Sequence, residues 1–288
     1  MPKGIPARLS GLPDYLTNRQ SSILNGCLLG DGGITKPQCR PYKETRRFGQ
    51  CNFTETHESK CLSYVQWLYK ELEPFSKTIQ HYTRPGRKKL ANGKVVNDYT
   101  KICSGDELRT VRVSLFSRLR ELWYPEGKKI VPESILLDPL TIAVWAAGDG
   151  SNCQDEGKFR FCTEGFARCE VDMLCEKLNE FGEFRVYKHK GGWIISTVAT
   201  SYQDFMLFLQ KHMPWDCFRY KCDSSNYVCP QYRITRLSEE QIRNVFTLKK
   251  QGMLQRRIAD KLGMSQQHVS QVLLLRYPLY RRISKEMP

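Results

Sequence analysis

The sequence lacks any apolar run near the roughly 18 residues that a membrane-spanning helix needs. Its first sixteen residues, MPKGIPARLSGLPDYL, also lack the apolar core of a signal peptide. We therefore expect an intracellular protein of the cytoplasm, nucleoid or an organelle matrix, neither secreted nor bound to a membrane. Low-complexity sequence is absent, and the polar stretch 223–236 is the only obvious linker.

The sequence has no C-x-x-C pair, although it contains 12 cysteines. A long chain without a secretion signal favours reduced thiols over a disulfide framework. Cys217, Cys222 and Cys229 are separated by four and six residues, a spacing that fits a zinc site poorly. Buried free thiols are the expectation, and structural zinc is the lesser alternative.

Acidic residues are too few to balance the basic ones: 30 Asp and Glu face 45 Lys and Arg, which gives a net charge of +15. This excess favours a polyanionic partner, because each cation placed on a phosphate releases condensed counterions. A nucleic acid is the favoured partner, and a basic protein without such a partner is the alternative. The 288 residues are enough for two cores of roughly 100–150 residues each.

A diverged internal repeat organises most of the chain. SILNGCLLGDGG at 22–33 corresponds to PLTIAVWAAGDGS at 139–151, and NFTET at 52–56 corresponds to FCTEG at 161–165. We predict helices at 62–72 and 171–181, strands within 77–102 and 184–199, and further helices at about 107–122 and 201–212. Each repeat, 15–125 and 126–225, then has the order α-β-β-α-β-β-α.

Both apolar stretches that open the repeats carry small residues four positions apart, on one helix face, and both end in Gly-Asp-Gly. Close parallel packing of these helices would bring Asp31 and Asp149 together. Adjacent carboxylates repel unless protonated or neutralised, and Mg²⁺ prefers carboxylate oxygen. Two-metal sites suit phosphodiester cleavage. The alternative is that each Gly-Asp-Gly only ends a helix and begins a turn. The small residues are Gly26, Gly30, Ala143 and Ala147.

At these residues the sequence resembles the LAGLIDADG homing endonucleases in their monomeric, two-motif form. ILNGCLLGDG at 23–32 and LTIAVWAAGDG at 140–150 occupy the two motif positions. The resemblance extends to WYPEGKKIVP at 123–132, to the segment 57–75 and to Arg-Tyr-Lys at 219–221. It covers about residues 15 to 225.

The resemblance implies an α+β fold in which two pseudo-symmetric αββαββα repeats form saddle-shaped antiparallel sheets that straddle the DNA major groove. It implies a monomer that makes a Mg²⁺-dependent double-strand break in a long DNA target, with short 3′ overhangs, as in intron homing. Asp31 and Asp149 would bind two or three divalent ions. We expect Mn²⁺ to substitute, and Ca²⁺ to bind without supporting cleavage.

By motif position, Lys129 and Lys221 match basic residues near the scissile phosphates, although Lys128 could take the place of Lys129. Glu55 and Glu164 match positions that order water or metal. The second motif departs from the family in having Ala-Gly before Asp149, where an acidic residue commonly precedes the metal ligand. Alternatively, these lysines and glutamates are ordinary solvated charges, which is their usual place.

Basic residues gather in the hairpins of both repeats. A two-stranded ribbon fits the major groove, so these side chains are candidates for base and phosphate contacts, although isolated charge runs are more often solvated loops. The first repeat contributes Arg40, Lys43, Arg46, Arg47, Arg84, Arg87, Lys88 and Lys89, and the second contributes Lys158, Arg160, Arg185, Lys188 and Lys190.

The region 237–288 is predicted to hold three helices, at 239–250, 254–262 and 265–275. Residues 255–270 resemble a helix-turn-helix, with Ala259 at the helix crossing, Gly263 in the turn and Ser265 as N-cap. A three-helix protein-interaction module is the alternative. If the unit binds DNA, the side chains facing the groove are Gln266, Gln267, His268 and Gln271.

Two other classes compete with the endonuclease. A non-cutting transcription regulator can combine a degenerate core of this family with a helix-turn-helix, but it has no need for the retained pair Asp31 and Asp149 beside Lys129. An intron maturase would prefer structured RNA, and a DNA-type helix-turn-helix argues against it. The sequence leaves open whether the carboxy-terminal module extends the target or regulates transcription.

Overall fold

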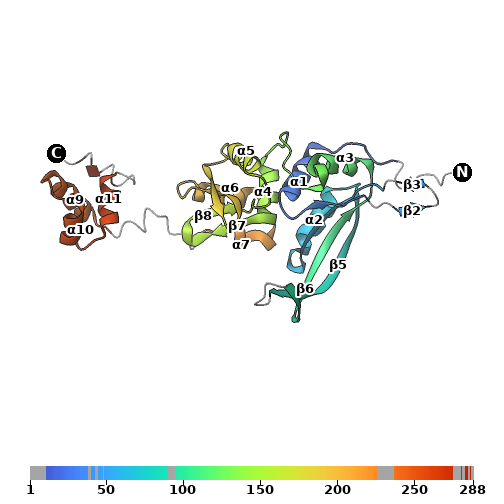
Figure 1. Cartoon of the computed structure of the whole chain (residues 1–288), viewed down its shortest axis with the longest axis horizontal. Helices are drawn as coiled ribbons and strands as arrows, with labels where there is room; N and C mark the ends of the chain where they lie inside the picture. The colour runs from blue at the N-terminus through green and yellow to red at the C-terminus, as the bar shows by residue number, and fades with distance from the viewer. Residues whose placement is uncertain are drawn as a thin grey trace. The chain divides into compact units, whose positions relative to one another are not determined.

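The computed structural model describes residues 11–37, 40–42, 45–47, 49–89, 95–225, 237–274, 280, 283, 284 and 286. The chain divides into two compact units, Met1–Asn226 and Tyr227–Pro288. The first unit holds two successive copies of one arrangement of helices and strands, and the second unit is helical (Figure 1). Among the described residues, no helix is long and apolar enough to cross a membrane.

The first repeat builds a four-stranded antiparallel sheet in the order β1-β4-β6-β5. A separate two-stranded sheet, β2-β3, lies within the connection between β1 and β4. The elements are α1 (Asn18–Leu29), β1 (Gly33–Ile34), β2 (Arg40–Tyr42), β3 (Thr45–Arg47), β4 (Phe53–Glu58), η1 (Ser59–Cys61), α2 (Leu62–Glu71), β5 (Ser76–Lys89), β6 (Val95–Thr110) and α3 (Ser114–Trp123).

The second repeat builds the matching sheet in the order β7-β8-β10-β9, so β7 corresponds to β1 and β8 to β4. The predicted αββαββα order is confirmed in both repeats. The elements are α4 (Pro139–Asp149), β7 (Gly150–Cys153), η3 (Gln154–Glu156), β8 (Lys158–Phe161), α5 (Arg168–Leu178), β9 (Phe184–His189), β10 (Gly192–Thr197), α6 (Tyr202–His212), η4 (Asp216–Phe218) and α7 (Arg219–Cys222).

The predicted start of the helix at about residue 107 is wrong, because β6 continues to Thr110 and α3 begins only at Ser114. Asp106, Leu108 and Thr110 are all buried, which is the two-residue period of a strand with one covered face. Pairing with β4 and β5 on both sides holds this segment in the sheet.

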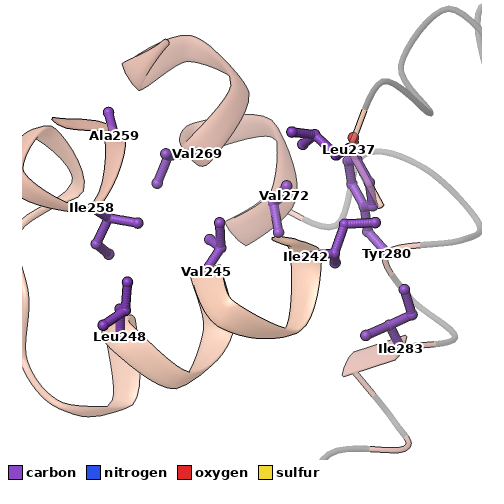
Figure 2. Packing of buried hydrophobic residues seen from close by; sticks show 10 residues of the cluster. All are labelled: Leu237, Ile242, Val245, Leu248, Ile258, Ala259, Val269, Val272, Tyr280 and Ile283. Atoms are coloured by element: carbon purple, nitrogen blue, oxygen red, sulfur yellow. The ribbon is translucent and has the colours of Figure 1, made fainter. Parts of the chain in front are cut away.

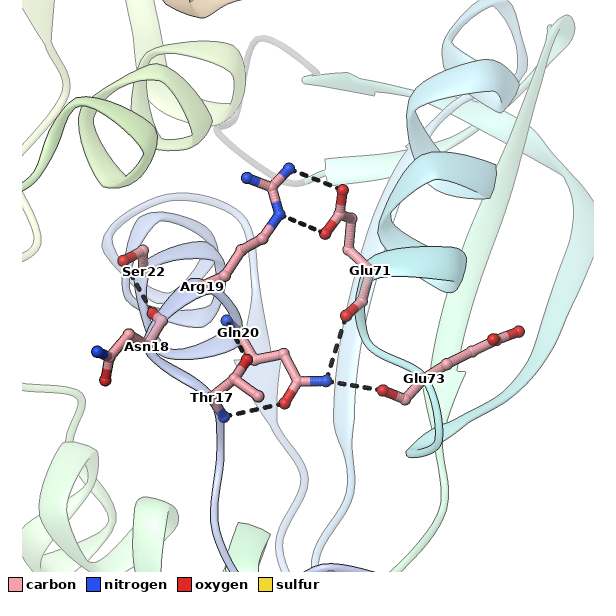
Figure 3. Close-up of polar contacts among 7 residues, drawn as sticks. All are labelled: Thr17, Asn18, Arg19, Gln20, Ser22, Glu71 and Glu73. Carbon is pink, nitrogen blue, oxygen red and sulfur yellow. Dashed lines mark hydrogen bonds and ion pairs between the residues drawn. The ribbon is translucent and has the colours of Figure 1, made fainter.

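The amino-terminal end of α1 is tied to the end of α2 (Figure 3). Thr17 and Gln20 form a reciprocal capping box, which satisfies backbone donors that the first turn leaves free. The Gln20 side-chain amide also donates to the carbonyl oxygens of Glu71 and Glu73, at 3.3 and 2.7 Å. Arg19 makes a two-pronged ion pair with the Glu71 carboxylate at 2.6 and 2.8 Å. These bonds fix where α1 enters the repeat.

The second unit contains α9 (Glu239–Lys250), α10 (Gln255–Leu262) and α11 (Gln266–Leu273). Gly263 ends α10 in the left-handed conformation, with φ of +62°, which a glycine adopts at little cost. Ser265 then caps α11 by accepting a hydrogen bond from the His268 amide. Figure 2 shows the apolar core that the three helices share, made by Leu237, Ile242, Val245, Leu248, Ile258, Ala259, Val269, Val272, Tyr280 and Ile283.

Candidate active site and nucleic-acid interface

The helices that open the two repeats, α1 and α4, pack directly on each other. A methyl group on Gly26 would lie 2.6 Å from the Thr141 carbonyl oxygen and 2.7 Å from Cβ of Val144, so only glycine fits there. The α4 surface that meets Gly26 is therefore Thr141 and Val144, and not the predicted stripe of Ala143 and Ala147. One small side chain facing a larger one gives the close approach that the sequence suggested.

The same two helices touch at both ends, which shows that they run parallel. At the amino-terminal end, the Ser22 hydroxyl donates to the Asp138 carboxylate, and the Thr141 hydroxyl donates to the Ser22 carbonyl oxygen at 3.1 Å. At the carboxy-terminal end, Gly30 and Gly148 face each other. Because the chain continues from each glycine into an aspartate, this end of the helix pair brings two carboxylates together.

The backbones that carry Asp31 and Asp149 are in van der Waals contact through the adjoining glycines. A methyl group on Gly30 would lie 3.5 Å from the Asp149 nitrogen, and one on Gly148 would lie 3.5 Å from the Asp31 nitrogen. Asp31 is exposed, whereas Asp149 is half-buried. Burial and the charge of Asp31 raise the pKa of Asp149 to about 6. The pair thus has the repulsion that a cation would relieve.

A lysine lies beneath each aspartate and donates to the carbonyl groups that end the helix. Lys129 Nζ donates to the carbonyl oxygens of Gly30 and Gly32 at 3.0 and 2.9 Å. Lys221 Nζ donates to those of Ala146, Ala147 and Gly148 at 3.2, 2.6 and 2.8 Å. Burial lowers the pKa of both lysines, and the nearby carboxylates oppose that change. Lys128 is exposed and forms none of these bonds, so Lys129 is the lysine at the site.

Glu55 lies under the first motif, on β4. Its carboxylate is 2% exposed, and Oε1 contacts Nε2 of His57 at 2.9 Å. Its Oε2 has no N–H or O–H partner among the described residues and would lie 2.4 Å from a methyl group on Gly32. Burial raises the pKa of Glu55, with the charge of Asp31 acting in the same direction. A buried carboxylate with a free oxygen can accept a proton or hold a water molecule.

Glu164 is not the counterpart of Glu55 in space. Strand register pairs Gly33 with Thr54 in the first repeat and Ser151 with Arg160 in the second, which aligns Glu55 with Phe161. Glu164 follows the end of β8, is partly exposed, and contacts Nδ1 of His189 at 2.9 Å. The two clusters have the same Thr-Glu sequence but lie at different positions in the strand register. The predicted equivalence of Glu55 and Glu164 is therefore wrong. The two half-sites therefore differ chemically.

The predicted DNA-contacting residues lie on the strands, with a difference between the repeats. Arg84 and Arg87 on β5 form no ion pair with a described residue, and Arg84 lies over the Tyr82 ring. In the second repeat Lys158 and Arg160 both pair with Glu156, and Arg185 pairs with Glu183. Lys188 lies on β9 and Lys190 in the turn after it. Lys43 lies outside the described residues, as do the side chains of Arg40, Arg46, Arg47, Lys88 and Lys89.

A polar groove of about 710 Å³, not predicted from the sequence, lies over the first sheet. Its amides, hydroxyls and cations can donate and accept hydrogen bonds as base edges require. The alternation in β4, where Thr54 and Thr56 reach solvent between buried neighbours, was the available signal. Its lining includes Thr35, Lys36, Asn52, Thr54, Lys77, Gln80, Arg109 and Arg112.

In the second unit, Gln266 and His268 are exposed and Gln271 is partly exposed on α11, whereas the side chain of Gln267 lies outside the described residues. Arg256, Arg257 and Lys261 are exposed on α10, and none forms an ion pair with a described residue. The exposed surface of this small unit therefore includes amides on α11 and, on α10, cations that form no ion pair with a described residue.

No group of three or more His, Cys, Asp or Glu residues that could hold a metal ion occurs within the described residues. Cys229, part of the lesser zinc alternative, lies outside them. Asp31 and Asp149 are thus not joined by a third such side chain within the part of the chain that the structure describes.

The chain belongs to the LAGLIDADG DNA endonuclease family, whose profile matches residues 21–205. It is 27% identical over 179 residues to an uncharacterized protein of Methanocaldococcus jannaschii, a match covering 61% of this chain and 62% of that protein. It is 24% identical over 231 residues to the protein RecA of Mycobacterium gastri, covering 73% of this chain and 48% of RecA. The chain thus spans less than two thirds of either relative's length.

Among solved structures, the homing endonuclease I-WcaI bound to its DNA recognition sequence is similar, with a TM-score of 0.55 and 19% identity. The alignment covers 73% of this chain and 88% of that chain. At this level of identity the similarity shows a shared fold. The fold is that of the family to which residues 21–205 belong.

Proposed function

We propose that the protein is a site-specific, metal-dependent endonuclease that makes a double-strand break in a long DNA target. The observation that carries this proposal is the contact of Gly30 with Gly148, which brings Asp31 and Asp149 to one end of the helix pair. Fold alone permits many functions, whereas paired carboxylates over two buried lysines are a feature of a reactive site.

The donor set fits Mg²⁺. This ion typically takes one or two carboxylates from the protein and completes its shell with water and substrate phosphate. When bound, divalent ions would activate water and stabilise the leaving oxygen, and two or three of them at Asp31 and Asp149 would serve both strands. Mn²⁺ has the same preference for oxygen ligands, and we expect Ca²⁺ to support binding alone.

The chain's own groups hold this site in place. Lys129 and Lys221 fix the carbonyls that end α1 and α4, and so fix the backbone from which each aspartate projects. A lysine has three N–H donors. Lys129 uses two of them, so one remains for a phosphate oxygen, and Lys221 uses all three. Glu55, with a free Oε2, is placed to order water beside Asp31.

Double-stranded DNA is the proposed substrate. The net charge of +15 and the unpaired arginines of the β5–β6 ribbon supply the phosphate contacts, and the polar groove over the first sheet supplies contacts to base edges. Two related repeats in one chain suit the two strands of a duplex, so we propose that a monomer acts.

The test is cleavage of plasmids that carry candidate insertion junctions, with Mg²⁺, with Ca²⁺ and with EDTA. We expect linear product with Mg²⁺ only, and its loss in Asp31→Asn and Asp149→Asn variants that still bind DNA. Tight binding without cleavage under any divalent ion would identify a non-cutting regulator. Preference for structured RNA over duplex DNA would identify a maturase.

A further inference from the structure

The two repeats differ in how far their strands extend. In the first repeat β5 and β6 contain 14 and 16 residues, whereas the corresponding β9 and β10 contain six residues each. At a rise of about 3.3 Å per residue, the ribbons are roughly 46 and 20 Å long. The first ribbon also carries the unpaired Arg84 and Arg87, while Arg185 of the second is neutralised by Glu183. The first repeat can follow its flank of a duplex much further.

The other connection shows the same difference. Between β1 and β4 the chain makes the additional β2-β3 sheet, whereas β7 and β8 are joined by η3 and Gly157 alone. The basic residues beside this short turn, Lys158 and Arg160, are both paired with Glu156. The second repeat therefore has no extended strand structure, and little free positive charge, at the tip of β7-β8.

The chain leaves the second repeat at this same short tip. The Asp223 carbonyl oxygen accepts hydrogen bonds from the side-chain amides of Asn152, at the end of β7, and Gln154, in η3, each at 2.6 Å. Asn152 is in turn held by the Tyr202 hydroxyl at 2.7 Å. The segment that leads to the second unit thus starts from a fixed point. Asn152 lies three residues along the chain from Asp149, a distance of about 10 Å in an extended strand.

The second unit carries what the second repeat lacks. α11 presents Gln266, His268 and Gln271, and α10 presents Arg256 and Arg257, exposed and without ion pairs to described residues. Residues 226–236 join Ser225 to Leu237, and eleven residues span at most about 40 Å when fully extended. A helical unit joined to the tip of β7-β8 by this length of chain can reach a duplex that lies along the second repeat.

We propose that the two flanks of the target are recognised by unequal means: the long ribbons of the first repeat contact one flank, and the helical unit 237–286 contacts the outer base pairs of the other. This division rests on the proposed DNA target, but not on cleavage. Here α11 supplies base contacts and the cations of α10 supply phosphate contacts.

The experiment uses the intact chain in Ca²⁺ to select sites from a long random duplex library, followed by hydroxyl-radical footprinting. Two double variants are compared with the wild type: Arg84→Ala with Arg87→Ala, and Gln266→Ala with Gln271→Ala. We expect the arginine variant to lose footprint protection on one flank, because phosphate contacts position the protein without reading sequence. The glutamine variant should lose about tenfold discrimination on the opposite flank, the size of one lost base contact. Gln251→Ala, the same change at an exposed position on the same unit, should alter neither flank.

The inference is overturned if the α11 variant keeps its discrimination on both flanks, or loses it on the flank affected by the ribbon variant, while thermal unfolding matches the wild type. Cleavage in Mg²⁺ is measured separately on the selected site. A chain that selects such a site but does not cut it contradicts the proposed function alone. A chain that cuts its selected site while the two sheets alone contact both flanks equally contradicts this inference alone. A chain that selects no DNA contradicts both proposals.

Discussion

Lys129 and Lys221 occupy equivalent places beneath the two motif helices, each donating to the carbonyl oxygens that end its helix. They reach these places from unrelated parts of the chain, one between the repeats and one after the second. A cation at a helix carboxy terminus opposes the negative end of the helix dipole and occupies carbonyls that lack a partner. Each lysine is thus a structural cap and a positive charge that acts on both aspartates.

Replacing one of these two lysines should slow cleavage of one DNA strand more than cleavage of the other. We expect Lys129→Met to slow cleavage of one strand, and Lys221→Met of the other, by at least about a hundredfold, the usual effect of losing one electrostatic contact in a reactive site. Nicked plasmid would then accumulate before linear product, which gel analysis of a time course measures. Lys128→Met, which changes an exposed neighbour, is the control. If both variants slow the same strand, the assignment of one lysine to each half-site fails.

The two motif helices, α1 and α4, approach each other most closely at Gly26. Gly26→Ala would place a methyl group 2.6 Å from the Thr141 carbonyl oxygen and 2.7 Å from Cβ of Val144. We expect a loss of about 1–3 kcal/mol in the free energy of unfolding, as for other overpacked sites. Urea denaturation measures it.

Gly148→Ala provides the matched control, since its methyl group would meet nothing nearer than 3.5 Å. The better helix propensity of alanine should then leave stability unchanged or raise it by up to about 1 kcal/mol. Equal losses in both variants would show that the helices do not pack through Gly26.

Asp149 should make the metal-free protein less stable as pH rises. Its pKa is about 6 in the folded chain, above the ordinary value near 3.9, so the folded state keeps a proton that the unfolded state releases. Stability from this proton is present below pH 4 and lost by about pH 6, and amounts to at most roughly 3 kcal/mol. We expect thermal unfolding in EDTA to show this decline for the wild type and a smaller one for Asp149→Asn. A parallel decline in both would place the titrating group elsewhere.

Gly263 should matter only to the second unit. With φ of +62°, its replacement by alanine should cost that unit about 1 kcal/mol, since a side chain disfavours left-handed backbone. Calorimetry of the intact chain should show a lower melting temperature for that unit and an unchanged one for the first. Gly165→Ala, at a site with no atoms near the added methyl group, should shift neither transition.

The internal repeat made most of the fold predictable. Two apolar stretches ending in Gly-Asp-Gly fixed the ends of α1 and α4, and matching the two copies of the repeat located most other elements to within a few residues. The start of α3 was placed too early, at about 107, because pairing between strands far apart in the sequence decides residues 107–110. Such pairing leaves no local signal.

Some residues of the candidate site could be predicted from the sequence and others could not. Asp31 and Asp149 could be inferred because they stand at the same point of a repeated motif. Glu164 was misassigned because matching letters, Thr-Glu, suggested a register that the strands do not follow. The groove over the first sheet was missed since its side chains come from four separate segments, each ordinary by itself. Only the folded structure shows that these four segments line one groove.

The Asp223 carbonyl, held by Asn152 and Gln154, makes the end of the first unit a fixed junction. The two repeats before it form one compact unit with their own sheets and core. If the second unit binds DNA as proposed, a different binding module joined after Ser225 would start from the same point on the second repeat and leave the paired aspartates in place. The proposed enzyme could then be redirected to another target by exchanging this attachment while both repeats stay unchanged.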